Sequence, residues 1–325
     1  MTGRPTRVIV SIDTEEDDWG SFDSAPPSVK NIVELPRLQE LFERFGVRPT
    51  YFVNLAPLSS APAVATLGEV AAREGVEIAT HCHPWNTPPI AGPSGEAGSM
   101  MCALDAELNR AKIETVTQAL ETELGVRSRS FRTGRWGFGP SVARPLADLG
   151  YRIDSSVSPF IDWSEIGGPD YRTAQHVPYR FEPERPFEVD PKGSMVQVPT
   201  TVGFLRGEQT SANRVRTAME RSWVRRLKVI GVLDRMGFYA KRWLSPETSS
   251  GRDMVRLART LLAAEVSVLS MTFHSCTLLP GATPFVRDRS DRQAFLASIE
   301  QFLSFCKGEG VPFASVSEVG APLLN

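Results

Sequence analysis

The sequence predicts an α/β protein whose strands run parallel, and two observations indicate this class. Short runs rich in valine, isoleucine and phenylalanine alternate with segments of helical periodicity, as in successive βαβ units. The first run, Arg7–Ile12, is almost wholly apolar, which is typical of a strand buried on both faces. At 325 residues, the chain has the length of one α/β barrel or of two medium-sized domains.

Eight runs are expected to form strands, because each is short, rich in apolar or β-branched residues and bounded by polar or turn-forming positions. In parallel α/β folds the active site is built at the carboxyl ends of the strands. Residues that close these runs are therefore candidates for function. The expected strands are Arg7–Asp13, Pro49–Asn54, Val76–His83, Ser130–Thr133, Arg152–Ser155, Met195–Pro199, Val266–His274 and Phe313–Ser315.

Helices are expected between the strands. Val33–Phe45 carries leucine and phenylalanine at helical spacing and stops at Gly46, because glycine readily adopts the left-handed conformation that ends a helix. Glycines also follow the next three helices, and Pro140 precedes the last of these three. The remaining expected helices are Ala63–Glu74, Ala103–Leu124, Ser141–Leu149 and Arg292–Cys306, and the expected loops are Pro84–Ser99 and Gly167–Pro191.

The composition is that of a globular protein, with 41% hydrophobic and 23% charged residues and a formal net charge of −2. A chain of this charge has no general affinity for nucleic acid or other polyanions. No apolar run is long enough for a signal peptide or a membrane span, so we expect a cytoplasmic protein. The four cysteines form no CxxC pair and are expected to be reduced thiols, with Cys82 a buried one.

Two groups of residues at strand ends have the chemistry of a metal site. His81 and His83 are two residues apart, so in an extended strand both imidazoles lie on one side. Asp13 and Glu15 have the same spacing within an acidic run that follows the first strand. One carboxylate on a metal and a second acting as general base are the requirements of a hydrolytic zinc site with an open position for water.

Each of these features also has a plainer interpretation. An acidic run after a strand is often a solvated loop or a helix N-terminus. Histidines on one face of a strand can be satisfied core residues, and His274, which closes another expected strand, can be purely structural. The histidine pair is the stronger signal, since the chain contains only four histidines.

The run from Phe131 to Pro140 is a candidate for substrate contact. It combines Arg132, Arg135 and Trp136 with three glycines, which allow close approach of a ligand to the backbone. An arginine can hold a carboxylate through two hydrogen bonds, and an indole face suits the apolar side of a sugar ring. The alternative is a tight turn with an arginine stacked on the tryptophan. Asp154 could orient a catalytic imidazole, or it could serve as a helix cap or turn residue.

The segment 206–242 contains ten basic residues against Glu208, Glu220 and Asp234, with aromatic and aliphatic residues interleaved. Such a segment is usually a solvated helix face. The interleaving also makes it a candidate surface for anionic lipid or a polyanionic glycan, which would place the protein peripherally on the inner membrane.

With these residues in view, the chain resembles the polysaccharide deacetylase family, carbohydrate esterase family 4, which is also called the NodB-homology domain. The resemblance covers most of the chain in order. Within the family the chain is most similar to the WalW-like group, in its acidic first motif and in the run that begins at His81. The five family motifs correspond to 11–15, 77–81, 131–132, 151–156 and 273–274.

The resemblance implies a distorted (β/α)7 barrel in one catalytic domain, residues 1–325, with a basic helical insertion at about 204–260. It implies a metal-dependent carbohydrate N-deacetylase that uses one divalent ion, usually zinc. The substrate would be an N-acetylated sugar or a sugar–lipid precursor in surface-polysaccharide biosynthesis, and the partners would include no nucleic acid. Two alternatives are a hydrolase of a non-sugar amide and a metal-free barrel that binds carbohydrate or a partner protein.

The resemblance also implies roles for individual residues. Asp13 would be the base, His274 the acid that protonates the leaving amine, and Arg132 the group that holds Asp13. Because the acidic run continues past Glu15, Glu16 or Asp17 could replace it as the carboxylate ligand. The expected metal ligands are Glu15, His81 and His83, and the expected substrate-binding residues are Arg135, Trp136 and Trp85.

Overall fold

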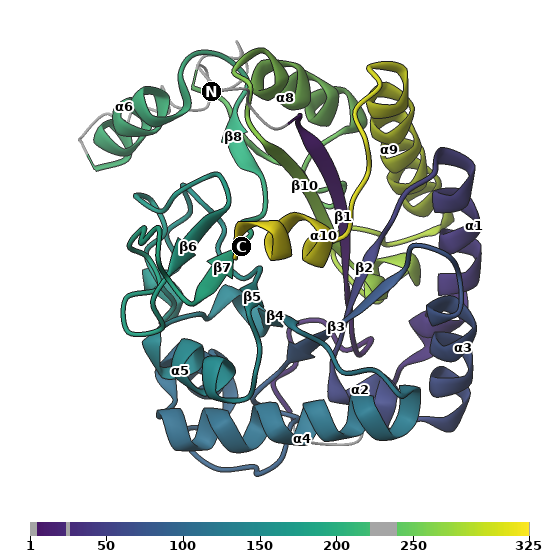
Figure 1. Ribbon diagram of the computed structural model, residues 1–325. Coiled ribbons are helices and arrows are strands. Elements are labelled where there is room, and N and C mark those ends of the chain that lie inside the picture. The colour runs from purple at the N-terminus through teal and green to yellow at the C-terminus, as the bar shows by residue number, and fades with distance from the viewer. Residues whose placement is uncertain (1–4, 24–26, 222–238, 325) are drawn as a thin grey trace.

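We analysed a computed structural model of the protein, which describes residues 5–23, 27–221 and 239–324. Its main feature is an eight-stranded sheet that curls into a distorted half-barrel (Figure 1). All neighbouring strands pair in parallel except β6, which pairs antiparallel with β7 at one edge. The strand order is β10 (Val268–His274), β1 (Arg7–Thr14), β2 (Thr50–Val53), β3 (Glu77–Cys82), β4 (Ser130–Thr133), β5 (Ile153–Asp154), β7 (Met195–Gln197), β6 (Tyr179–Phe181).

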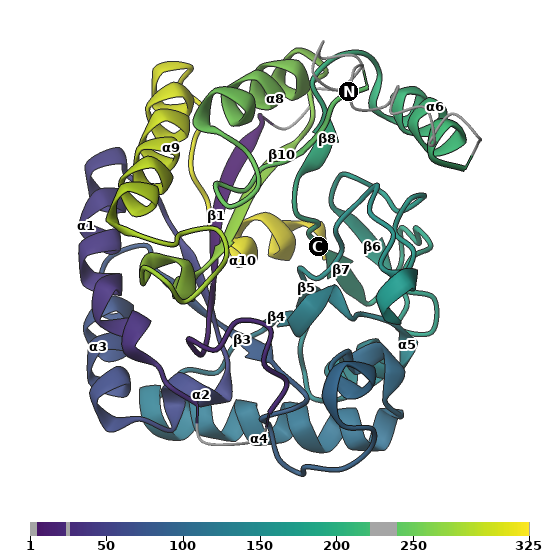
Figure 2. The same ribbon diagram turned by 180° about the vertical axis from the view of Figure 1, so that it is seen from behind.

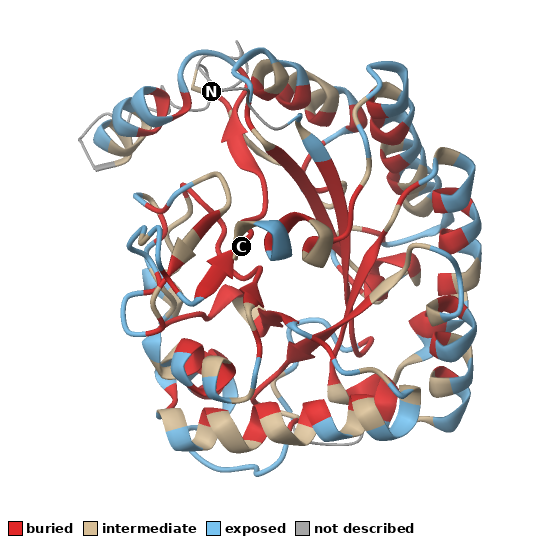
Figure 3. Ribbon diagram, in the orientation of Figure 1, coloured by how far each residue is buried: buried red, intermediate tan, exposed pale blue. Residues whose placement is uncertain are grey.

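Helices cover the outside of the curled sheet, and the view from behind in Figure 2 shows the same ring. In Figure 3 the strands of the large sheet are mostly buried, whereas the outer faces of the helices are exposed. Each long helix turns an apolar face inward and a polar face to water. The apolar residues at helical spacing in the sequence are therefore the ones that pack against the sheet. The covering helices are α1 (Leu35–Phe45), α3 (Ala61–Ala71), α4 (Ala106–Leu124), α5 (Pro140–Asp148), α8 (Gly251–Ala263) and α9 (Arg289–Gly308).

Strand β1 shows how alternation along one strand divides the core. Val8, Val10 and Ile12 join the apolar layer beneath the helices. Ile9 lies instead in the cluster inside the barrel, which α10 (Val316–Gly320) closes at the amino ends of the strands. The next inward residues are therefore Ser11 and Asp13. The barrel interior thus changes from apolar to polar along the strand, toward the carboxyl ends.

A second, two-stranded sheet stands beside the barrel. It pairs β8 (Val202–Phe204) antiparallel with β9 (Lys241–Trp243), and α6 (Gln209–Arg221) extends from it at an outer corner of the molecule (Figures 1 and 2). The sequence predicted a helical insertion here, and α6 lies within it. The middle of the basic segment, residues 222–238, lies outside the described residues.

The structure corrects three details of the predicted elements. Phe313–Ser315 is not a strand: Phe313 makes only an isolated bridge to Val8, and Ser315 caps α10. The expected loop Gly167–Pro191 contains β6, which was missed because it has only three residues. Gly75 does not end α3, which stops at Ala71. Within the described residues, none of the helices combines the length and the apolar character that a bilayer crossing requires.

Candidate active site

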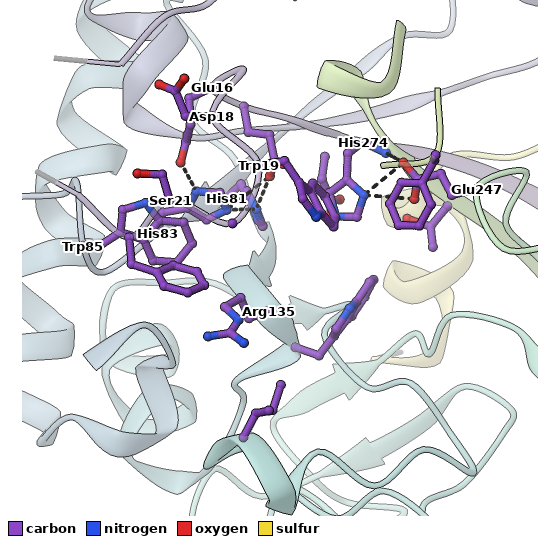
Figure 4. Close-up of a pocket in the computed structure, with 18 of the residues that line it drawn as sticks. Glu16, Asp18, Trp19, Ser21, His81, His83, Trp85, Arg135, Glu247 and His274 are labelled. Atoms are coloured by element: carbon purple, nitrogen blue, oxygen red, sulfur yellow. Dashed lines mark hydrogen bonds and ion pairs between the residues drawn. The ribbon is translucent and has the colours of Figure 1, made fainter. Parts of the chain in front are cut away.

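The carboxyl ends of four parallel strands surround a cavity of about 610 Å3. Register places Asp13 of β1 beside His274 of β10, and His81 of β3 beside Arg132 of β4. The sequence placed each of these residues at or near the end of a strand. The curl of the sheet brings Asp13, His81 and His274 to one cavity, and Figure 4 shows His81 and His274 there. Active sites of parallel α/β folds generally lie at the carboxyl ends of the strands, and this cavity has that position.

Glu15, His81 and His83 form a buried cluster in this cavity. The two Nε2 atoms lie 2.9 Å apart, and Glu15 Oε2 lies 3.5 Å from His81 Nε2 and 3.2 Å from His83 Nε2. Among the residues that the structure describes, this is the group of histidine, cysteine and acidic side chains whose ligand atoms are close enough to hold one metal ion. Two imidazoles and a carboxylate are a ligand set typical of zinc and related transition metals.

The outer nitrogens of both imidazoles are already engaged. His81 Nδ1 donates to the carbonyl oxygen of Arg132 at 2.9 Å, and His83 Nδ1 lies 2.7 Å from Glu16 Oε1. With each Nδ1 proton so directed, the Nε2 atoms face each other and the carboxylate of Glu15. Burial opposes a charge on His83, but Glu16 and Glu15 outweigh it and raise its pKa to about 10. The cluster therefore favours a positive charge here, and its donors fit a divalent cation.

Asp13 is held by a fully buried arginine. Arg132 Nη1 donates to Asp13 Oδ1 and, at 2.9 Å, to Thr272 Oγ1, while Nη2 donates to Ser11 Oγ and Ser155 Oγ. Its Nε donates to the carbonyl oxygen of Ser155, so all five N–H groups have acceptors. A buried charge needs such partners, and the result is a carboxylate fixed at the edge of the cavity.

His274 stands across from Asp13, with its Nε2 3.7 Å from Asp13 Oδ2. Its Nδ1 lies 3.0 Å from Glu247 Oε2, and its backbone N–H donates to Glu247 Oε1 at 2.9 Å. Burial opposes a charge on the ring, but Glu247 and Glu15 outweigh it and raise the pKa of His274 to about 10. His274 is thus a protonated group that faces a carboxylate.

Sequence reasoning missed Glu247. It follows β9 by four positions and comes from a different element than any of the predicted site residues. It also lies within the expected insertion at about 204–260, where no strand had been predicted, so neither spacing nor strand-end position marked it. A third contact fixes its orientation, since Thr277 Oγ1 donates to Glu247 Oε1 at 2.6 Å.

Aromatic side chains form much of the cavity wall. Trp85 stacks on the His83 ring with centroids 4.1 Å apart, and Trp19 meets His274 edge-on at 4.7 Å. Trp136 contacts Trp243, a residue of the β8–β9 sheet, at 5.1 Å. The cavity also reaches the three predicted substrate-binding residues, because Trp85, Arg135 and Trp136 all line it. Indole faces at such positions suit the apolar face of a sugar ring.

The turn after β4 is shaped around His83. A Cβ atom added to Gly134 would lie 2.4 Å from His83 Cδ2, so only glycine fits. Arg135 and Trp136 then both adopt positive φ angles, 53° and 61°, which is uncommon for residues with a side chain. Arg135 donates to Glu96 at 3.0 Å and to Ser99, so its guanidinium is anchored at the cavity wall.

The structure decides between the alternatives left for Asp154. Its Oδ1 accepts from the backbone N–H of Ser156 at 2.9 Å and from Gln197 Nε2, and its Oδ2 accepts from Ser156 Oγ. This is the turn role. The hypothesis that Asp154 orients a catalytic imidazole is wrong, because Glu247 holds that place beside His274.

The carboxylates that could have replaced Glu15 are engaged elsewhere. Asp17 accepts hydrogen bonds from Ser28 Oγ and from the backbone N–H groups of Lys30 and Asn31. It therefore joins the two ends of the loop that follows β1. Glu16 contacts the outer edge of the His83 ring. The geometry therefore selects Glu15 as the carboxylate of the cluster.

A buried lysine fixes the segment that follows His83. Lys112 of α4 is fully buried, and its Nζ donates to the carbonyl oxygens of Pro84, Thr87 and Pro89 at 2.7 to 2.8 Å. Three acceptors satisfy all three ammonium protons. These three hydrogen bonds, called here the Lys112 tether, anchor the proline-rich loop on either side of Trp85, the residue that stacks on His83.

No protein-family model and no curated protein matches the sequence. Among solved structures, the chain is similar to a candidate polysaccharide deacetylase from Mycobacterium smegmatis, with 17% identity over 98% of this chain and 89% of the other and a TM-score of 0.57. A 4-α-glucanotransferase from Thermococcus litoralis gives 13% identity, a TM-score of 0.51, and coverage of 97% of this chain and 40% of the other. At these identities the likeness concerns the fold alone. The chain has the distorted (β/α) barrel fold of a polysaccharide deacetylase.

Proposed function

We propose that the protein is a metal-dependent hydrolase that removes the acetyl group from an N-acetylated sugar. The observation that carries this proposal is the buried cluster of Glu15, His81 and His83 in the same cavity as Asp13 and His274. One fold can support many different reactions, so the proposed reaction is inferred from these side chains. Within the family resemblance, the WalW-like group is the one that we propose on motif grounds.

Each residue would have a distinct task. A divalent ion held by Glu15, His81 and His83, zinc by the nature of the donors, would polarise the amide carbonyl and acidify the attacking water. Asp13 would accept the proton of that water. Arg132, which is paired with Asp13, would keep that carboxylate correctly placed.

His274 would then protonate the departing amine. The carboxylate of Glu247 keeps the ring protonated and turns its Nε2 toward Asp13. A general acid and a general base side by side at the cavity wall match the needs of amide hydrolysis, in which one proton is taken and one is given.

The substrate class follows from the cavity wall. Stacked and edge-on aromatic rings beside polar groups favour a pyranose ring over a flexible peptide, and Trp85, Trp136 and Arg135 would contact it. We further propose that the substrate is a sugar or sugar–lipid precursor of surface-polysaccharide biosynthesis, that residues 1–325 form one domain, and that the enzyme works in the cytoplasm. Segment 206–242 would contact anionic membrane.

Metal content and acetate release together test the proposed function. The purified protein should carry one divalent ion per chain and release acetate from at least one of a panel of N-acetylated mono- and oligosaccharides. A chelator should stop the reaction, and adding back zinc should restore it. Stoichiometric metal without acetate release from any sugar would favour a non-sugar amide, whereas absence of metal would favour a binding protein.

A further inference from the structure

We propose that Glu16 is a positioning residue that holds His83 in the orientation in which its Nε2 binds metal, and that it strengthens metal binding. The inference rests on the metal site of the proposed function. It concerns a side chain that neither the strand-parity argument nor the resemblance assigned to this task.

Glu16 bridges His83 to a fixed point of the scaffold. Its Oε1 lies 2.7 Å from His83 Nδ1, and its Oε2 accepts from Asn54 Nδ2 at 2.6 Å. Asn54 is in turn anchored, because its Oδ1 accepts from the backbone N–H of Ala56 at the start of a short helix and its own N–H donates to Thr14 O. Both oxygens of Glu16 are thus engaged, and the carboxylate is buried with 5% of its surface exposed.

This arrangement makes the two candidate histidine ligands unequal. His81 Nδ1 donates to a neutral peptide carbonyl, that of Arg132, whereas His83 Nδ1 donates to the carboxylate of Glu16. Asn54 Nδ2, which donates to the same carboxylate, lies 3.0 Å from His83 Nδ1. A charged acceptor binds an imidazole N–H more strongly and makes the opposite nitrogen a better electron donor. His83 is therefore the ligand whose orientation and donor strength depend most on its outer partner.

Glu16 itself is poorly placed to bind the same ion. It contacts Nδ1, and the ion would lie at Nε2 on the far side of the ring, where Glu15 Oε2 is 3.2 Å away. The ligand atoms close enough to share an ion come from Glu15, His81 and His83. Glu16 thus acts through His83.

The test compares Glu16→Gln with Glu96→Gln. Both variants remove one negative charge from a residue that lines the cavity, but Glu16 contacts a histidine of the cluster whereas Glu96 contacts Arg135. The measurement is the dissociation constant for Zn²⁺ and Co²⁺, obtained by competition with a chromophoric chelator. Measuring it over a range of pH separates the affinity for metal from competition by protons. Loss of an outer partner typically weakens metal binding by roughly 10–100-fold.

We expect Glu16→Gln to weaken binding by about that factor and to change the visible absorption of bound Co²⁺, and we expect Glu96→Gln to do neither. Equal losses in the two variants would show a general effect of charge and overturn the proposal, as would unchanged binding in Glu16→Gln. The variant Glu16→Asp keeps the charge but withdraws the carboxylate. It should also weaken binding, and wild-type affinity in it would contradict a positioning role.

The outcome is separable from the proposed function. A wild-type protein that binds metal but releases no acetate would disprove the deacetylase proposal, while the ratio of dissociation constants would still decide the role of Glu16. A wild-type protein that binds no divalent metal would overturn both. Thermal unfolding of the metal-free variants provides the control for folding.

Discussion

The metal-binding side of the cavity and its proton-transfer side are assembled from very different stretches of the chain. The metal-binding side comes from β1, β3 and the residues just after them, and consists of Glu15, Glu16, His81 and His83. The proton-transfer side needs β1, β4, β10 and the residues after β9, and consists of Asp13, Arg132, His274 and Glu247. The first side is compact in sequence, whereas the second depends on long-range pairing.

The two sides also treat charge differently. On the proton-transfer side each carboxylate has its own buried cation: Arg132 for Asp13, and His274 for Glu247. On the metal-binding side two carboxylates, Glu15 and Glu16, face two imidazoles that are neutral when both bind metal. On the proton-transfer side the charges are paired within the protein, and on the metal-binding side the proposed cation would balance them. Changes on the first side should therefore affect turnover, and changes on the second should affect metal binding first.

The largest effect is expected from His83→Ala. Removing one of three protein ligands should reduce bound metal to well below one per chain and acetate release to background, a greater loss than the roughly 10–100-fold expected for an outer partner. The matched control is His176→Ala, which removes the histidine that packs on Phe160 away from the cluster. Metal analysis of both variants checks this, and wild-type metal content in His83→Ala would move the site elsewhere.

Asp13→Asn should separate the two sides. It should keep the metal and lose turnover by about 10²–10⁴-fold, because it removes a general base while preserving shape. It also leaves Arg132 buried without its ionic partner, so the free energy of unfolding should fall by up to about 3–5 kcal/mol. Metal content, acetate release and urea unfolding are the measurements. Unchanged turnover would remove Asp13 from the mechanism.

Glu247→Gln should change the pH dependence rather than metal binding. The active form of a general acid is protonated, so turnover is lost as pH rises through the pKa of His274, which lies at about 10 in the folded protein. Without the Glu247 charge this pKa should fall toward the ordinary value of about 6.5. The alkaline limb of kcat should move to lower pH, with a loss of about tenfold for each pH unit above the new pKa. An alkaline limb at its wild-type position would show that His274 is not the acid.

The smallest effect is expected from Lys112→Met, which tests whether the metal-binding side depends on the loop that follows His83. Methionine keeps the apolar stem but leaves the carbonyl oxygens of Pro84, Thr87 and Pro89 without their donor. We expect a loss of about 1–3 kcal/mol in unfolding free energy and a modest rise in the metal dissociation constant. Lys192→Met, at an exposed position, is the control. Wild-type metal affinity in Lys112→Met would show that the Lys112 tether has only a structural role.

The metal-binding side was predictable from sequence because its signal is local. A spacing of two on a strand places His81 and His83 together whatever the rest of the fold does, and the same parity relates Asp13 to Glu15. The parallel strands of the large sheet were predicted within a few residues, since continuous apolar runs bounded by turns have few other interpretations. The family resemblance then ordered these strands into a barrel.

What the sequence did not reveal depends on partners distant along the chain. Nothing near Glu247 marks it as the companion of His274, because the pair forms only when the chain returns from β9 to the end of β10. Asp154 shows the reverse case. It stands at a strand end, where function is expected, but both of its carboxylate oxygens accept hydrogen bonds from Ser156 or Gln197. A position in the fold can be predicted more readily than the hydrogen bonds made there.

The pairing of β1 with β10 has a consequence for the order in which the protein can be made. β1 is synthesised early, yet one of its two neighbouring strands, β10, lies some 260 residues later in the chain. The hydrogen bond from the backbone N–H of Glu15 to Ser275 Oγ spans the same separation. Until that part emerges from the ribosome, one edge of an apolar strand has no partner, and an open edge of this kind is prone to pair with other chains. Glu15, His81 and His83 are by then already made, so a metal ion held by these three residues would link the ends of β1 and β3 across β2 while β10 is still to come.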